Sequence, residues 1–457
     1  MSGPMYFESA VEQAEAVQKR QVSRVELVRA HLERIERLNP QLNAFTDLCP
    51  RDALRRAGAA DKAKAPPRSA LDGAVIGVKD LNMVRGTFTR FGTPFTRYFV
   101  APMDDVIVAR LKAAGAAIVG KLATSELGTM PVTEPPIHPP TRNPFVPERN
   151  AGGSSGGSGS AVAAGLLSLA HGSDGAGSIR IPAAFCGVFG FKPTHALVPN
   201  PVETLDRADL TVNGPIASNV RDLAAMVDVL AALHREQALL PKLDAAPKRH
   251  LRVMVSYDTT ISPTEPAIKD GVRRVAEWFL RAGHQVDEAP WFAGKVEEFV
   301  PIWQRLVADL PIPIDRGMSP VARWLRSHGR TLARHEVANH KRGIAERIDR
   351  WFEPADVWIS PTVGTFAPPN GSFRHMDGAS AFFAAAPIGA FTAVFNLSGQ
   401  PAGSVPIGFG AGGQPFGVQI AAKRHDDLTV LRLMRALEAD FAKERRARKP
   451  QISAHAA

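Results

Sequence analysis

The order of apolar and polar positions along the chain predicts a strand–helix–strand architecture. Near the amino terminus, apolar side chains recur every three or four residues, which predicts a helix over residues 6–38 that stops at Pro40. Two short apolar runs predict buried strands: residues 74–79, which end in the charged Lys79, and residues 117–120. Residues 105–114 between them have helical spacing. A helix that connects two strands in this way is typical of an α/β fold with parallel pairing.

The rest of the chain extends this alternation. Residues 131–147 hold seven prolines among turn-forming residues, which indicates a structured loop. The further elements that we expect are a helix and then a loop over residues 50–70, a strand at 251–256, a helix at 267–282, helices over 290–352, a strand at 357–359 and two strands within 403–421. No internal repeat accompanies this order, so the pattern does not divide the chain into similar halves.

Composition places the protein among ordinary globular chains. Of its 457 residues, 45% are apolar and 22% are charged, so the chain can bury a large core. The formal net charge of +10 would suit a nucleic-acid partner, but no nucleic-acid-binding motif accompanies it and we expect none. The sequence shows neither a secretory signal nor an apolar stretch long enough to span a membrane. We therefore expect a cytoplasmic protein without a membrane partner.

Residue types that bind metals or form disulfides show no organised pattern. Cys49 and Cys186 lie outside any CxxC pair, and the thirteen histidines are scattered without ligand spacing. Two buried thiols are expected, with a single disulfide as the alternative. We expect no metal and no cofactor.

Residues 152–160 form a run of glycine and serine that resembles a flexible linker by composition alone. The alanine-rich residues 161–170 follow at once and predict a buried helix, so we expect a loop whose backbone approaches a ligand. A phosphate-binding loop would end in Lys followed by Ser or Thr, and this run does not. Ser155 fits the G-x-S-x-G pattern of a nucleophile elbow, although polar residues precede it where an elbow has a strand. A triad hydrolase built on Ser155 remains an alternative.

A second cluster of small residues lies just beyond this run, where Gly175, Ala176 and Gly177 precede Ser178. Their small side chains leave successive backbone N–H groups uncovered. Such donors can stabilise the oxyanion that forms when a serine attacks a carbonyl carbon. A tight turn between two core elements would have the same composition, so this cluster alone leaves both interpretations open.

Three separate stretches, residues 73–80, 152–157 and 172–182, together resemble the amidase signature family. They occur in the family's order and with its spacing between Ser154 and Ser178. The resemblance implies that Ser178 is the nucleophile, that Ser154 is a proton relay on a cis peptide bond and that Lys79 is the base. A free lysine titrates near ~10.4, so the site must lower the pKa of this lysine. A strand-end lysine that faces solvent is the ordinary alternative.

The resemblance also assigns roles to the residues around these three. The oxyanion hole is expected to consist of the backbone N–H groups of Gly175, Ala176, Gly177 and Ser178. Ser155 is expected to hydrogen-bond within the triad. Asp174 and Arg180 are expected to pair and hold the loop, which is also what a routine core ion pair would do. His171 has no catalytic role in the family.

Finer matches resemble one subgroup of the family. The family usually has Thr or Ile followed by Gly where this chain has Gly175 and Ala176. A small residue followed by Ala-Gly-Ser is similar to the 6-aminohexanoate cyclic dimer hydrolases, as are residues 133–135, 170–172 and 395–401. The likeness leaves the substrate itself open.

The resemblance implies a single amidase domain over residues 1–457, with a large mixed β-sheet covered by helices on both faces. Its core is expected at roughly residues 70–240 and 355–435, with a helical insertion at roughly 290–350. The pocket is expected to be built from residues 127–140 and from that insertion.

The predicted function is hydrolysis of a small linear or cyclic carboxamide through a serine acyl-enzyme. One alternative is a glutamyl-tRNA amidotransferase A-type subunit, which hands ammonia to a partner enzyme. Another is a catalytically inactive binding protein on the same fold. The sequence leaves open whether the chain acts as a monomer or as a homodimer.

Overall fold

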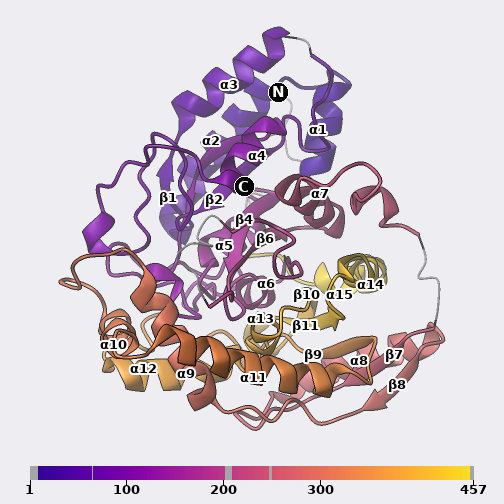
Figure 1. Cartoon of the computed structure of the whole chain (residues 1–457). Coiled ribbons are helices and arrows are strands. Elements are labelled where there is room, and N and C mark those ends of the chain that lie inside the picture. The colour runs from indigo at the N-terminus through magenta and orange to yellow at the C-terminus, as the bar shows by residue number, and fades with distance from the viewer. Residues whose placement is uncertain (1–8, 64, 201–207, 246–249, 453–457) are drawn as a thin grey trace.

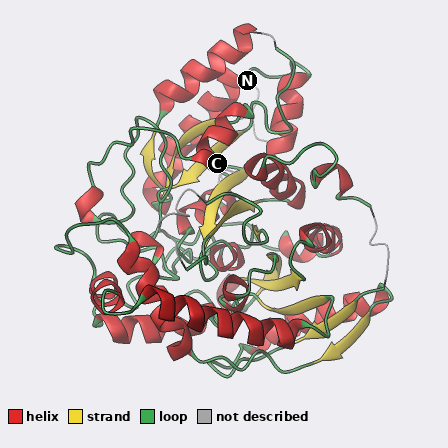
Figure 2. Cartoon of the chain, in the orientation of Figure 1, coloured by secondary structure: helices red, strands yellow, loops and turns green. Residues whose placement is uncertain are grey.

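The computed structural model describes residues 9–63, 65–200, 208–245 and 250–452. Within these residues, eleven strands form one mixed sheet in the order β1-β3-β2-β4-β6-β5-β10-β11-β9-β7-β8 (Figures 1 and 2). The strands are β1 (Phe45–Leu48), β2 (Val75–Lys79), β3 (Ala117–Leu122), β4 (Leu169–Asp174), β5 (Phe189–Lys192), β6 (Val212–Ala217), β7 (Arg252–Val255), β8 (Gln285–Glu288), β9 (Val357–Pro361), β10 (Ala402–Phe409) and β11 (Pro415–Ala422).

Helices cover both faces of this sheet. They are α1 (Ala10–Gln18), α2 (Arg24–Leu42), α3 (Pro50–Ala63), α4 (Val106–Ala113), α5 (Gly156–Ala163), α6 (Arg180–Phe185), α7 (Val220–Ala231), α8 (Pro266–Arg281), α9 (Val296–Asp309), α10 (Pro320–Gly329), α11 (Arg334–Phe352), α12 (Gly378–Ala385), α13 (Val394–Leu397), α14 (Asp427–Asp440) and α15 (Ala442–Arg445). One face packs against α4, α7, α8 and α14. The other packs against α2, α3, α5 and α6, and then against α9 to α13. The predicted α/β fold, with a mixed sheet covered on both faces, is confirmed.

Parallel pairing at one end of the sheet brings the motif residues together. β2 lies between β3 and β4 and runs parallel to both, whereas β4 is antiparallel to β6. The carboxyl ends of parallel neighbours reach the same edge of a sheet. Lys79, the last residue of β2, is therefore placed beside the end of β4 at Ser173 and Asp174.

The alternation of side chains along β2 decides which way Lys79 points. Ile76 and Val78 belong to the core beneath α4 and α7, and Val75 belongs to the opposite core beneath α2 and α5. Successive strand residues face opposite sides, so Lys79 faces the same side as Val75. That is the side on which the glycine- and serine-rich run leads into α5.

The predicted first helix is two helices. Residues 6–8 lie outside the described residues, and the rest of the pattern divides into α1 and α2, with Arg20 in a left-handed conformation (φ 56°) between them. Ser23 caps the amino terminus of α2, where its side chain accepts a hydrogen bond from the Glu26 amide and the Glu26 side chain accepts one from the Ser23 amide. Pro40 does not stop the second helix, which continues to Leu42. Proline lacks only the N–H, and Asn43 closes the last turn with a hydrogen bond to the Asn39 carbonyl at 2.8 Å.

The predicted helix over residues 161–170 is displaced. α5 begins earlier, at Gly156 inside the glycine- and serine-rich run, and ends at Ala163, while Leu169 and Ala170 already belong to β4. A Cβ at Gly157 would lie 2.3 Å from the Ala123 amide nitrogen. The start of this helix therefore packs against backbone, which only glycine permits.

The other expected elements are present close to their predicted bounds. The predicted strands correspond to β2, β3, β7, β9, β10 and β11. The predicted helices correspond to α3, α4, α8 and α9 to α11. Figure 1 shows α9 to α12 gathered on one side of the molecule. No helix among the described residues combines the length and the apolarity that crossing a membrane requires.

Candidate active site

Lys79 is fully buried and hydrogen-bonded at the edge where β2 and β4 end. Its Nζ donates to Ser154 Oγ at 2.8 Å, to Ser173 Oγ at 3.0 Å and to the Ser173 carbonyl at 3.1 Å. Burial lowers the pKa of Lys79 to about 7, although the charge of Asp174 acts to raise it. In a substantial fraction of the molecules, the Lys79 side chain is therefore uncharged near neutral pH. In that form the amine has a lone pair that can accept a proton from Ser154.

Ser154 follows a cis peptide bond from Gly153, as the family resemblance implied. Its carbonyl accepts hydrogen bonds from the Ser125 amide and from Thr133 Oγ1, both at 3.3 Å. A Cβ at Gly153 would lie 2.6 Å from the Val132 amide nitrogen. Close backbone packing thus fixes the segment that presents the Ser154 hydroxyl to Lys79.

Ser155 joins the two serine segments through its backbone and its side chain. Its amide donates to the Ser178 carbonyl at 3.2 Å, and its hydroxyl donates to the Ser173 carbonyl at 3.2 Å. The side chain is fully buried and lies at the start of α5 rather than after a strand. These contacts favour a positioning role for Ser155, not the nucleophile-elbow alternative.

Asp174 and Arg180 form the predicted ion pair, and both are fully buried. The guanidinium donates to both carboxylate oxygens, at 2.9 and 3.0 Å. Burial acts to raise the pKa of Asp174, but the charge and the hydrogen bonds of Arg180, together with the charge of Lys192 and the Ile179 amide, outweigh burial and lower the pKa to about 2. The Asp174 carboxylate also accepts hydrogen bonds from the amides of Gly177, at 2.6 Å, and Ile179, at 3.1 Å. The ionised carboxylate of Asp174 thus holds the turn in place through hydrogen bonds to the backbone amides around it.

This use of Asp174 changes one part of the predicted oxyanion hole. The amide of Gly177 already donates to Asp174, so it differs from the expected free donor. The hydrogen bonds of the described residues leave the amides of Gly175, Ala176 and Ser178 without a partner. The carbonyls nearby are occupied, since Thr392 Oγ1 donates to the Ala176 carbonyl at 2.7 Å. The turn therefore offers three N–H donors instead of four.

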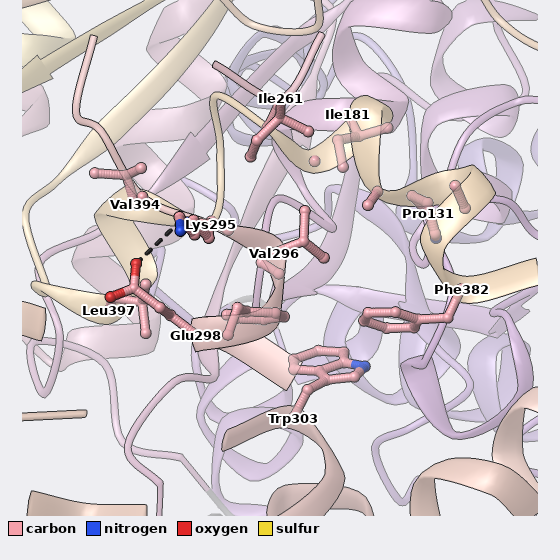
Figure 3. A pocket seen from close by; sticks show the side chains of 18 of the residues that line it. Pro131, Ile181, Ile261, Lys295, Val296, Glu298, Trp303, Phe382, Val394 and Leu397 are labelled. Carbon is pink, nitrogen blue, oxygen red and sulfur yellow. Dashed lines mark hydrogen bonds between the residues drawn. The ribbon is translucent and has the colours of Figure 1, made fainter. Parts of the chain in front are cut away.

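Ser178 lies where two cavities meet. The first, which we call the Ser154 cavity, is lined by Ser154, Ser173, Gly175 and Ser178 and by apolar side chains that include Leu81 and Leu310. The second, the Phe382 cavity, is lined by Ala176 and Ser178 and by a mainly apolar wall. In Figure 3 that wall includes Pro131, Ile181, Val296, Trp303, Phe382 and Val394. Gly128, Ser178 and Trp303 line both cavities.

Charged groups are scarce in both linings. Among the described residues, none that lines the Ser154 cavity has an ionisable side chain. The Phe382 cavity has Lys295, which is exposed, and Glu298. The carboxylate of Glu298 accepts the Lys295 amide at 3.0 Å (Figure 3) and pairs with Arg347. Ionisable side chains in the two linings are therefore limited to Lys295 and Glu298 among the described residues.

His171 is fully buried within β4. Its Nε2 lies 3.1 Å from Asn213 Oδ1. Burial and, to a smaller extent, the charge of Lys79 lower the pKa of His171 to about 3. The side chain lines neither cavity.

Four residues of the site were not predicted from the sequence. Ser173, a second partner of Lys79, could have been inferred because β4 is the parallel neighbour of β2. Trp303, Thr392 and Asn396 come from distant parts of the chain. Asn396 lies in the matched stretch 395–401 and Trp303 in the expected pocket insertion, but no role was assigned to either, and no local motif marks Thr392. Asn396 donates to the Asp174 carbonyl at 2.7 Å, so it supports the same turn from the other end of the sequence.

The chain is similar to known amidases and to related proteins. A family model described as Amidase matches residues 26–431. A putative amidase from Synechocystis sp. is 32% identical over 449 residues, covering 94% of this chain and 88% of that protein. The A-type subunit of the glutamyl-tRNA(Gln) amidotransferase from Thermus thermophilus is 39% identical over 282 residues, 60% of this chain and 58% of that protein. A solved structure of 6-aminohexanoate cyclic dimer hydrolase matches with a TM-score of 0.88 and 29% identity, covering 97% of this chain and 98% of that one.

The fold and these relatives together define an α/β enzyme that hydrolyses amides. The chain belongs to the Amidase family, which confirms the resemblance found in its sequence.

Proposed function

We propose that this enzyme hydrolyses a small, uncharged carboxamide through a serine acyl-enzyme, with Ser178 as nucleophile, Ser154 as proton relay and Lys79 as base. The observation that carries this proposal is the 2.8 Å hydrogen bond between Lys79 Nζ and Ser154 Oγ. It joins a hydroxyl to a buried amine whose pKa burial lowers to about 7. A base with a pKa near the working pH is effective in both directions of proton transfer.

Acylation begins when Ser178 Oγ attacks the carbonyl carbon of the amide. Its proton passes to Ser154 Oγ while the Ser154 proton passes to Lys79 Nζ. Ser154 and Ser178 line the same cavity, but the hydrogen bonds of the described residues do not yet join their hydroxyls. Catalytic hydrogen bonds are often long before the substrate is bound and shorten in the complex. We infer that rotation of the Ser178 hydroxyl toward Ser154 on substrate binding completes the relay.

The negative charge that develops on the carbonyl oxygen needs donors that are already in place. The unpartnered amides of Gly175, Ala176 and Ser178 supply them, because the Asp174 carboxylate holds the turn in shape. Preorganised donors of this kind cost no reorganisation during the reaction, and the loss of one typically slows an enzyme by about 10²–10³.

The tetrahedral intermediate then collapses with cleavage of the carbon–nitrogen bond. Lys79 returns its proton through Ser154 to the nitrogen, which leaves as a neutral amine or ammonia. Water next attacks the Ser178 ester and gives a proton to Lys79 by the same route. When Ser178 Oγ leaves, it takes that proton back, and the carboxylic acid is released. Each cycle consumes one amide and one water and restores Lys79 and both serines.

The linings of the cavities favour a substrate without charges. Free glutamine carries an ammonium and a carboxylate, which when buried require ionic partners. The Ser154 cavity offers none among the described residues, and in the other cavity Glu298 is already paired with Arg347, which leaves no partner for the ammonium and only the exposed Lys295 for the carboxylate. This disfavours the amidotransferase alternative. A cyclic amide such as that named for the solved structural relative has no charged terminus, so linear and cyclic neutral amides are both suitable.

Turnover of a panel of neutral linear, cyclic and aryl amides, with glutamine alongside, tests this function. We expect hydrolysis of at least one neutral amide and none of glutamine. A fluorophosphonate should label the wild type and should fail to label Ser178→Ala, which also separates an enzyme from an inactive binding protein. Labelling that persists in folded Ser178→Ala would show that another residue is the nucleophile.

A further inference from the structure

Trp303 forms the wall between the two cavities that meet at Ser178. Its indole lines both cavities and is only 6% exposed. The ring stacks on Phe299, with centroids 5.5 Å apart, and its Nε1–H donates to the Thr129 carbonyl at 3.3 Å. Figure 3 shows the ring facing Phe382 across one of the cavities. These contacts fix its position from two sides.

Gly175 is the residue on which this indole rests. A Cβ at Gly175 would lie 3.0 Å from both Cη2 and Cζ3 of Trp303, whereas its next neighbour, Thr211 Oγ1, is at an ordinary 3.6 Å. The φ angle of Gly175 lies outside the left-handed region, so the backbone does not require glycine here. A Cβ at this position would instead require the Trp303 ring to move by a few tenths of an ångström. The usual Thr or Ile of the family would displace Trp303, so Gly175 and Trp303 fit as a pair.

We propose that Trp303, seated on Gly175, divides the substrate into two halves and determines which groups an amide can carry. The acyl part occupies the Phe382 cavity and the amine part occupies the Ser154 cavity. This inference rests on the proposed function, because it takes Ser178 as the nucleophile and Ser154 as the group that protonates the leaving nitrogen.

The position of the proton donor indicates which half of the substrate lies in which cavity. Ser154 lines only the Ser154 cavity, so a nitrogen that receives its proton from Ser154 must depart on that side. The acyl group remains bound to Ser178 and lies on the other side of Trp303, where Ala176 of the oxyanion turn also lines the wall. Because both linings are mainly apolar, the substrate class is a neutral amide with an apolar group on each side of the scissile bond.

Two matched variants at the ends of α9 test this assignment. Val296, its first residue, lines the Phe382 cavity, and Leu310, which follows its last residue, lines the Ser154 cavity. Both side chains are half-buried, so each accepts a larger residue with little strain. Val296→Trp should lower kcat/KM at least tenfold for amides with long acyl chains on a methylamine. Leu310→Trp should do so for acetamides of long amines, and each should spare the other series.

Deacylation gives a second readout that a change in general stability would not mimic. The amine has left before water attacks, so the acyl chain is the only part of the substrate that still occupies a cavity during this step. Single-turnover deacylation after loading with a long-chain ester should therefore slow much more in Val296→Trp than in Leu310→Trp, where only water has to reach Ser154. Slow deacylation in Leu310→Trp alone would reverse the assignment of the cavities.

A double-mutant cycle tests the pairing of Gly175 with Trp303. Gly175→Ala should lower kcat/KM at least tenfold in the wild type, because the added methyl group displaces the indole. In a Trp303→Ala background, Gly175→Ala should lower kcat/KM less than threefold. An equal cost in both backgrounds would show that Gly175 is needed for another reason. If Trp303→Ala fails to fold, Trp303→Phe can take its place in the double-mutant cycle.

Loss of the partition should also change selectivity. Trp303→Ala merges the two cavities, so amides branched next to the carbonyl should gain at least tenfold in kcat/KM relative to unbranched ones. An unchanged ratio would overturn the role of Trp303. These outcomes differ from failure of the proposed function, in which wild-type enzyme would hydrolyse no neutral amide and fluorophosphonate would not label Ser178.

Discussion

Arg180 neutralises Asp174 through two hydrogen bonds, at 2.9 and 3.0 Å, inside a fully buried turn. Lys79 lies close enough for the charge of Asp174 to act on its pKa, yet burial prevails and the pKa falls to about 7. The pairing with Arg180 thus has two consequences: it holds the turn in shape, and it leaves Lys79 without a direct counter-ion. Lys79 can lie near this carboxylate without pairing with it because Arg180 already does.

Arg180→Met should therefore destabilise the protein and alter its pH dependence. Removing one partner of a buried ion pair costs about 3–5 kcal/mol, because the other charge stays buried without compensation. The unpaired Asp174 should also raise the pKa of Lys79 and move the rise in activity to higher pH. Thermal unfolding and the pH profile of kcat/KM measure the two effects. The double variant Asp174→Asn with Arg180→Met should regain part of the lost stability, and no recovery would contradict the account.

The pH profile of the wild type should report Lys79. The base works only when uncharged, so kcat/KM should rise as pH increases through about 7 and level off above it. Below the midpoint the slope should approach about tenfold per pH unit. A substrate without ionisable groups ensures that the enzyme alone determines the profile. Activity that is flat or falls across this range would be inconsistent with a lysine base.

Lys79→Met should abolish efficient hydrolysis while the fold is retained. Loss of general-base catalysis typically lowers rates by about 10²–10⁴. Lys192 provides a matched control, since it is also fully buried and burial lowers its pKa to about 7. It donates to the Pro193 carbonyl at 2.9 Å and lines neither cavity. Lys192→Met should keep kcat per folded enzyme, and near wild-type rates in folded Lys79→Met would remove Lys79 from the mechanism.

Gly177→Ala should cost more stability than its backbone angle alone explains. Gly177 has φ of +121°, and a Cβ there would lie 2.1 Å from Thr392 Oγ1. Gly371 has a similar left-handed φ of +85° with nothing within 4 Å of the added Cβ. Gly371→Ala should therefore cost only the backbone term of about 1–2 kcal/mol. Gly177→Ala should cost clearly more in urea unfolding, and equal costs would mean that the Thr392 contact is easily relieved.

The sequence was sufficient for the parts of the fold that are apolar and regular. The strands that end at Lys79 and run through Ala117 could be predicted because both faces of each strand are buried. β4 and β6 were not predicted, since they include polar residues such as Ser173 and Asn213. These polar residues lie beside the candidate site, where chemistry and not packing decides the residue type.

The candidate site divides in the same way. Lys79, Ser154 and Ser178 could be located because each lies in a local motif with fixed spacing. Trp303 and Thr392 could not, because only the folded chain brings α9 and the segment before α13 to the turn. The hydrogen bond from the Gly177 amide to Asp174 was not foreseen for a similar reason, since the direction of the Asp174 carboxylate depends on Arg180 and on the surrounding packing.

The hydrogen bond from the Ser155 amide to the Ser178 carbonyl has a consequence for enzyme engineering. It joins the two serine segments through main chain, so their spacing does not depend on which side chains line the cavities. The cavity walls come largely from residues 81–99, from α9 and from the region of α12 and α13, which include none of Lys79, Ser154 and Ser178. Selectivity can therefore be redesigned by exchanging those walls, while the three proposed reacting groups are left unchanged.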